Sequence, residues 1–173
     1  MSKLSVNTIA HTGGTTAQTI DSTGRILTPA RPAFRAYLSS NLSGDADWTY
    51  SNTPKVLTFD TESYDIGGDY DTGNGKFIVP ITGLYHFDIA VYVSGVEQCT
   101  WVSTYIFVDG NQKSRTIVDP QGGGYGAPWL SDNLQLTAGQ EVTVRFGVIA
   151  DNSVLIHGNT SGSITYFTGY LIG

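Results

Sequence analysis

The stretch YDTGNGKFIVPITGLYHFDIAVYV, residues 70–93, decides the fold class. From Gly83 to Val93, side chains alternate with a period of two, as in a strand that buries one face. The side chains expected on the core face are Tyr85, Phe87, Ile89, Val91 and Val93; those expected on the opposite face are Leu84, His86, Asp88, Ala90 and Tyr92. The stretch therefore predicts a long, half-buried β-strand.

Similar short runs recur along the chain. We expect strands over residues 33–38, 55–59, 75–79, 83–93, 101–108, 113–118, 129–136, 141–149, 154–157 and 164–172. The pair Asp109-Gly110 between two apolar runs predicts a tight hairpin turn, and segment 62–71 has the composition of a turn-rich loop. No window has the apolar spacing of a capped helix. The pattern indicates an all-β, antiparallel jelly-roll sandwich.

Composition excludes several function classes. The 173 residues carry a net charge of −6 and are 40% hydrophobic, which suits one domain with an appendage. Lys and Arg form no cluster, so nucleic acid is not an expected partner. No apolar run reaches about 18 residues, so no membrane insertion is expected. Cys99 is the only cysteine, which excludes an intrachain disulfide and favours a small buried apolar role.

The first 31 residues differ from the head expected over residues 32–173. They contain no aromatic residue and cannot bury a core alone. Pro29 and Pro32 mark the boundary, because prolines interrupt the hydrogen bonding of a sheet. We expect this arm to become ordered by adding strands to a partner or by winding with identical chains. A flexible leader is the alternative.

Four motifs stand in a characteristic order. Segment 70–87 contains an aromatic-Asp pair, Thr-Gly, Gly-Lys-Phe, Pro and Gly-Leu-Tyr, and segment 32–36 reads Pro-Ala-Phe-Arg-Ala. Segment 134–142 reads Leu-x-Leu-x-x-Gly-x-x-Val, and segment 166–172 reads Tyr-Phe-x-Gly-Tyr-Leu-Ile. Together they resemble C1q-like domains, the globular heads of complement C1q and its relatives, which are related in fold to the tumour necrosis factor (TNF) family. One departure is Gln140, where that family has Asp.

This resemblance implies a head that assembles as a homotrimer. The aromatic residues that it assigns to the core or the trimer axis are Tyr85, Phe87, Phe167 and Tyr170, and we expect these four at the trimer interface. Members from animals carry a collagen stalk of Gly-X-Y repeats. The chain has no such stalk, and the arm stands in its place.

The arm carries a second resemblance. The patterns Leu-x-Val-Asn-Thr-Ile over residues 4–9 and Gly-Thr-Thr-Ala-x-Thr-Ile-Asp-Ser-Thr-Gly-Arg over residues 14–25 are similar to openings of bacteriophage tail-fibre and structural proteins. This resemblance implies a protein on the outer surface of a virion. The apolar side chains expected to attach it to other virion proteins are Leu4, Val6, Ile9 and Ile20.

No catalytic residue is expected. His86 and Asp88 share a strand face, yet no Gly-x-Ser-x-Gly elbow is present. The carboxylates of segment 62–71 suit a glycoside hydrolase less well than a role in binding backbone amides of turns. Some C1q-like heads bind calcium, and the hard oxygen ligands that would do so here are Asp65, Asp69 and Asp71. Solvated loop carboxylates are the alternative, and no other cofactor is expected.

Aromatic, Gly-rich loops are the candidate receptor-binding sites. Their principal side chains are Trp48, Tyr50, Tyr125 and Trp129. Such rings stack on glycans or pack against a neighbouring subunit.

The predicted function is a non-enzymatic, trimeric phage virion protein, a surface fibre or knob that contacts a host glycan or protein. A capsid decoration trimer that stabilises the shell through its arm is the first alternative. A soluble C1q-like glycan-binding lectin is an alternative of another class. The missing secretory pattern and collagen stalk count against the lectin.

Overall fold

The computed structural model describes residues 5–42, 51–120, 123–150, 154–161 and 164–173. In these ranges the chain consists of strands, turns and loops, and every strand pair is antiparallel. The predicted all-β sandwich is therefore confirmed. No helix long and apolar enough to cross a bilayer occurs in the described part of the chain.

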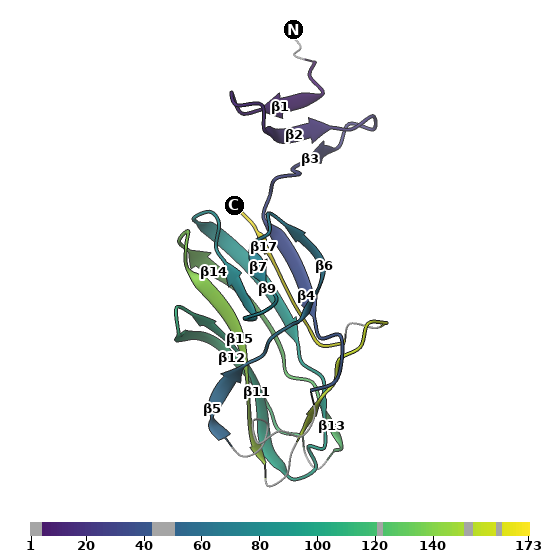
Figure 1. Cartoon of the computed structure of the whole chain (residues 1–173), viewed down its shortest axis with the longest axis vertical. Helices are drawn as coiled ribbons and strands as arrows, with labels where there is room; N and C mark the ends of the chain where they lie inside the picture. The colour runs from purple at the N-terminus through teal and green to yellow at the C-terminus, as the bar shows by residue number, and fades with distance from the viewer. Residues whose placement is uncertain (1–4, 43–50, 121–122, 151–153, 162–163) are drawn as a thin grey trace.

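Two sheets build the head (Figure 1). The five-stranded sheet has the order β14 (Trp129–Leu136), β9 (Gly83–Ala90), β17 (Tyr166–Leu171), β4 (Ala33–Tyr37) and β6 (Thr61–Ile66). The six-stranded sheet has the order β12 (Asn111–Val118), β11 (Cys99–Val108), β15 (Glu141–Ala150), β8 (Lys76–Ile78) and β7 (Tyr70–Asp71), and β5 (Ser51–Val56) also pairs with β15. A small sheet joins β13 (Tyr125–Gly126), β10 (Val93–Ser94) and β16 (Leu155–Ile156).

The core lies between the two large sheets and is rich in aromatic rings. Phe34 of β4 stacks on Tyr70 and on Phe77 of the opposite sheet, with ring centroids 5.0 and 4.7 Å apart. It also meets Phe167 of β17 edge-on at 4.8 Å. Aromatic contacts of this kind stabilise by about 0.5–1.5 kcal/mol each beyond the area they bury. These rings therefore hold the two sheets together.

The long strands follow the sequence prediction closely. Strand β14 coincides with its predicted range, and along β9 the side chains of Tyr85, Phe87 and Ile89 are buried, as the alternation predicts. The predicted strand over 55–59 is shifted, since β5 ends at Val56, although Leu57 and Phe59 are still in the core. Segment 62–71 is not a loop, because most of it forms β6 and β7.

The Asp109-Gly110 turn forms as predicted. Val108 of β11 pairs with Asn111 of β12, so only these two residues join the strands. Asp109 and Gly110 both have positive φ, 49° and 75°. Two-residue hairpins of this geometry require positive φ at both positions, which Asp and Gly tolerate best.

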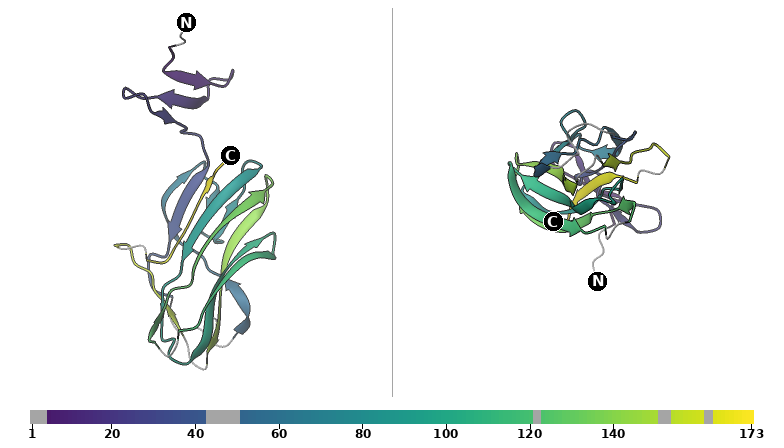
Figure 2. Two further views of the ribbon diagram at one scale, coloured as in Figure 1. Left: turned by 180° about the vertical axis from the view of Figure 1, so that it is seen from behind. Right: turned by 90° about the horizontal axis from the view of Figure 1, so that it is seen from below.

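The arm forms a sheet of its own, which the sequence did not predict without a partner. Its strands are β1 (Thr8–Ala10), β2 (Thr16–Ile20) and β3 (Ile26–Leu27), in the order β1-β2-β3. Figures 1 and 2 show this sheet standing off the end of the head at which the C-terminus lies. A short connecting segment, residues 28–32, joins this sheet to β4.

Gly169 is the position at which the aromatic core allows no side chain. A Cβ there would lie 2.5 Å from Cδ1 of Phe87 and 2.9 Å from Cε1 of Phe34. Both rings are fully buried, so neither can move aside without cost. We expect Gly169→Ala to lower the free energy of unfolding by about 1–3 kcal/mol, measured by thermal and urea denaturation. Gly173→Ala is the control, because a Cβ at Gly173 meets open space. Equal stability of the two variants would contradict this account of the core.

Candidate functional site

The outer face of the five-stranded sheet carries large side chains that no other described part of the chain covers. Alternation along the strands and the strand register put one set of side chains on this face. They are Trp129, Ser131 and Asn133 of β14, His86, Asp88 and Ala90 of β9, Tyr166, Thr168 and Tyr170 of β17, Arg35 of β4, and Tyr64 and Ile66 of β6. Trp129 is 69% exposed and Tyr170 is 44% exposed. We call this surface the β14–β6 face.

A hollow of about 410 Å³ lies at one end of the β14–β6 face. Its lining is mainly apolar and comes from Arg35, Ala90, Tyr92, Ala127, Trp129, Ile164 and Tyr166. The Arg35 guanidinium lies over the Tyr166 ring, 4.6 Å from its centroid. The hollow is thus an aromatic and aliphatic surface bordered by one cation, which suits burial against another apolar surface.

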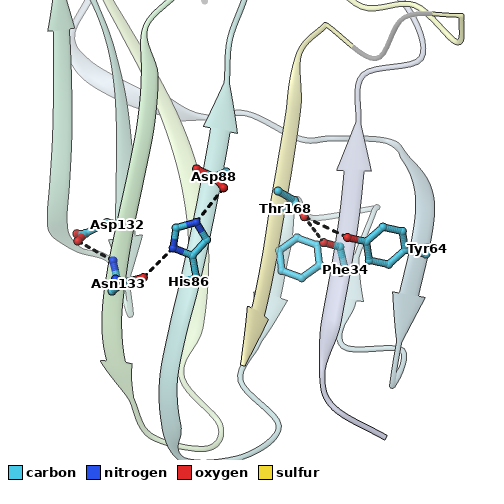
Figure 3. A network of polar contacts seen from close by, with 7 residues as sticks. All are labelled: Phe34, Tyr64, His86, Asp88, Asp132, Asn133 and Thr168. Carbon is cyan, nitrogen blue, oxygen red and sulfur yellow. Dashed lines mark hydrogen bonds and ion pairs between the residues drawn. The ribbon is translucent and has the colours of Figure 1, made fainter. Parts of the chain in front are cut away.

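A row of polar side chains crosses the middle of the same face (Figure 3). The His86 ring contacts the Asp88 carboxylate through Nε2 at 2.8 Å and Asn133 Oδ1 through Nδ1 at 2.7 Å. On the neighbouring strands, the Thr168 hydroxyl donates to the Phe34 carbonyl at 2.7 Å and lies 3.5 Å from the Tyr64 hydroxyl. The polar side chains of this row are therefore paired within the chain.

The surroundings of His86 favour its charged form. Burial disfavours the imidazolium, but the hydrogen bonds with Asn133 and Asp88 outweigh it, so the pKa of His86 is raised. The charges of Asp88 and Asp132 act in the same direction. The predicted shared face of His86 and Asp88 is confirmed, and its physical effect is to hold a proton.

The outer face of the six-stranded sheet differs because its own arginines cover its aromatic rings. The Arg145 guanidinium lies 4.0 Å from the centroid of Phe107, and the Arg115 guanidinium lies 4.7 Å from Trp101 and 4.9 Å from Tyr105. Tyr105 and Phe107 are buried as a result. The aromatic rings of this face are covered within one chain, whereas Trp129 and Tyr170 of the β14–β6 face are exposed.

Three of the four residues predicted at the trimer interface lie elsewhere. Tyr85, Phe87 and Phe167 are fully buried in the core of the single head and reach no surface. Their side chains point inward along β9 and β17, so their rings pack in the core between the two sheets. Tyr170 projects from the β14–β6 face instead, and its ring lies 5.2 Å from that of His86.

The residues predicted to form the receptor-binding loops do not form one site in the described part of the chain. Trp48 and Tyr50 lie outside the described residues. Trp129 is the first residue of β14 and lines the hollow, so it belongs to the sheet and not to a loop. Tyr125 of β13 is 63% exposed and stacks on Tyr92, with centroids 5.7 Å apart.

Tyr125 belongs to a cluster that the sequence did not reveal as a unit. His157 lies 5.1 Å from Tyr92 and 6.4 Å from Tyr125, ring centroid to ring centroid, and its Nε2 is 2.7 Å from the Ser94 hydroxyl. These residues come from three separate parts of the chain, and only the small β13-β10-β16 sheet brings them together. Strand β13 lies at the end of the head opposite the arm (Figure 1).

The predicted calcium ligands do not form a ligand set. No group of three or more acidic, His or Cys side chains suited to a metal ion occurs among the described residues, which include all three aspartates. The Asp71 carboxylate accepts hydrogen bonds from the backbone N–H groups of Gly73 and Asn74 and from the Asn74 amide. Asp65 accepts the N–H of Tyr70 at 2.9 Å. The Asp65 and Asp71 carboxylates thus bind backbone N–H groups, and calcium binding at Asp65, Asp69 and Asp71 stays a prediction.

Cys99 is half-buried at the start of β11 and packs against the core. Burial, together with the charge of Glu97, raises the pKa of its thiol to about 11. The thiol is therefore neutral at physiological pH and is a poor nucleophile.

Of the four apolar residues predicted to attach the arm to other virion proteins, two are exposed on the arm sheet. Leu4 lies outside the described residues, and Val6 precedes β1 and is half-buried. Ile9 and Ile20 lie on β1 and β2 and are exposed.

An antiparallel jelly-roll sandwich with exposed aromatic rings on the outer face of one sheet is the class that this geometry defines. A family model for the C1q domain matches residues 33–172, and the chain belongs to that family.

Solved structures share the same fold. The globular domain of zebrafish complement 1qA protein matches with a TM-score of 0.57 at 16% identity, over 82% of this chain and 98% of that domain. Murine APRIL at pH 5.0 matches with a TM-score of 0.59 at 13% identity, over 82% of this chain and 99% of that one. These likenesses confirm a jelly roll of the C1q/TNF type.

The His86 contact gives the head a pH-dependent term in stability. Because the folded-state pKa of His86 is raised, the contact contributes fully below its unfolded value of about 6.5 and is lost as the pH rises through the folded value. We expect Asp88→Asn to lower the pKa of His86, as followed by NMR titration of its ring protons. Glu62→Gln is the control, since β6 is separated from β9 by two strands. An unchanged pKa in the Asp88→Asn variant would show that Asp88 does not hold the proton.

Proposed function

We propose that the chain is a non-enzymatic homotrimeric head on the outer surface of a virion, where its arm attaches it to the particle and its far end contacts the host. The observation that carries the proposal is the difference between the two outer faces. Arginines cover the aromatic rings of the six-stranded sheet, while Trp129 and Tyr170 are exposed on the β14–β6 face. Exposed apolar patches of this kind mark interaction surfaces.

Self-association is the assembly that suits this face. Domains of the C1q/TNF family form homotrimers, and membership of that family supports a three-fold arrangement about the β14–β6 face. The polar row of His86, Asp88 and Asn133 is already paired within the chain. A partner surface can therefore cover it without leaving these groups unpaired, which would otherwise be costly.

The two ends of the head suit two different contacts. The arm leaves one end, and the Tyr125–Tyr92–His157 cluster lies toward the other. An exposed tyrosine stack beside a His–Ser pair offers a flat apolar surface with hydrogen-bonding groups at its edge, which suits sugar rings. This cluster is the proposed receptor contact of a fibre or knob. A decoration trimer is the second candidate, favoured by the exposed apolar residues of the arm.

The trimer is tested by charge substitutions on the open face. We expect Trp129→Asp and Tyr170→Asp to convert trimers to monomers, because each would bury an unpaired carboxylate in the interface. Ile117→Asp is the matched control: Ile117 is 55% exposed on β12, on the outer face of the six-stranded sheet. Mass measured by light scattering after size exclusion separates the outcomes. Trimers that persist in both face variants would reject the β14–β6 face as the contact.

The place on the particle is tested by labelling intact virions with an antibody to the head, viewed by electron microscopy. Label at the tail or at fibre tips is the expected result and makes the tyrosine cluster the receptor site. Label scattered over the capsid would show the decoration role instead. If purified particles carry no label and contain no copy of the chain, the virion location is rejected.

A further inference from the structure

We infer that the arms of three chains pack their isoleucine-bearing faces together, forming a three-sided β-prism on the axis of the trimer. This inference rests on the proposed homotrimer. It assigns the exposed apolar face of the arm to two further copies of this chain and not to another virion protein.

The isoleucines gather on one face of the arm sheet. Ile9 of β1 pairs with Gln18 of β2, and Ile20 of β2 pairs with Ile26 of β3. Residues paired across strands share a face, and so do residues two apart on one strand. Ile9, Gln18, Ile20 and Ile26 therefore lie together, and the three isoleucines are 50%, 36% and 64% exposed.

The opposite face of the arm sheet exposes one large apolar side chain, Leu27, where the isoleucine face exposes three. It carries the paired residues Thr8 and Thr19, with Leu27 opposite Thr19. We call the two surfaces the isoleucine face and the threonine face. Because burial stabilises in proportion to the apolar area covered, the isoleucine face is the one that gains more from being covered.

The arm sheet cannot depend on its own interior for stability. Its strands contain three, five and two residues. None of these strand residues is a buried apolar residue. Small sheets in water need a covered apolar face to be stable. Some other surface must therefore cover the isoleucines when the arm is ordered.

Two other copies of the arm are the best-placed cover. The arm connects through residues 28–32 directly to β4, a strand of the sheet that bears the β14–β6 face. If three heads meet through that face, their arms leave from the same end and start close to the axis. The short connection gives the arms a high effective concentration for one another.

The charges of the arm permit this packing. Asp21 and Arg25 form an ion pair in the turn between β2 and β3, with Nε 2.6 Å from Oδ2. Hydrogen bonds from Thr23 and Arg25 hold the pKa of Asp21 down at about 2. The polar residues that the pairing and the alternation put on the isoleucine face are Asn7, Thr16 and Gln18, and none of them is charged, so three copies meet without like charges opposed.

The test uses cysteines on the two faces of β2. Gln18→Cys is placed on the isoleucine face and Thr19→Cys on the threonine face, each in a full-length chain with Cys99→Ser. We expect mild oxidation to link chains efficiently through Cys at position 18 and not at position 19, as read on a non-reducing gel. The two variants differ by one position on the same strand, so arm flexibility alone would link both.

The outcomes separate the inference from the proposed trimer. Absent or equal cross-linking, with a three-chain mass by light scattering, overturns the prism and leaves the head trimer standing. A one-chain mass overturns both. Selective cross-linking at position 18 with a three-chain mass supports the prism.

A second pair of variants tests the same faces without cysteine. Ile26→Asp and Leu27→Asp change neighbouring exposed residues of β3 that lie on opposite faces. We expect Ile26→Asp to speed tryptic cleavage after Arg25 by about tenfold or more, because cleavage follows local opening of the arm. Leu27→Asp should cleave at close to the wild-type rate. Equal acceleration in both variants would overturn the assignment of the isoleucine face.

Discussion

The contact of the Phe34 ring with both sheets is the interaction on which the head depends. Phe34 stands on β4 of one sheet and stacks on Tyr70 and Phe77 of the other, while Phe167 meets it edge-on. The missing side chain of Gly169 leaves space for the rings of Phe34 and Phe87, which lie on the strands to either side of it. Because the core takes these rings, the alternating side chains of the same strands must face outward. The open face is therefore a consequence of how the core is built.

The two outer faces of the head differ in whether their aromatic rings are covered. One sheet covers its outward aromatic rings with Arg115 and Arg145. The other leaves Trp129 and Tyr170 exposed around a polar row that is already satisfied. In the proposed assembly this asymmetry sets the three-fold packing, and the packing in turn aligns the arms at one end and the tyrosine clusters at the other.

Sequence reasoning predicts most of the head and less of its sites. The alternation around Phe87 and the Asp109-Gly110 turn are local signals, and both fix their elements correctly. Strand β6 is missed because an edge strand with polar, exposed side chains has the composition of a loop. The interface prediction for Phe87 fails because aromatic character does not tell a core face from a contact face. The grouping of Tyr125 with His157 depends on tertiary structure and has no local signal.

The mass of the unmodified chain in solution tests the central claim most directly. Sedimentation velocity over a range of micromolar concentrations measures it without any substitution. The account predicts one species of three times the 18.6 kDa chain mass, stable to dilution. A species of 18.6 kDa at every concentration would contradict the account, because the open face would then have no partner in the protein itself.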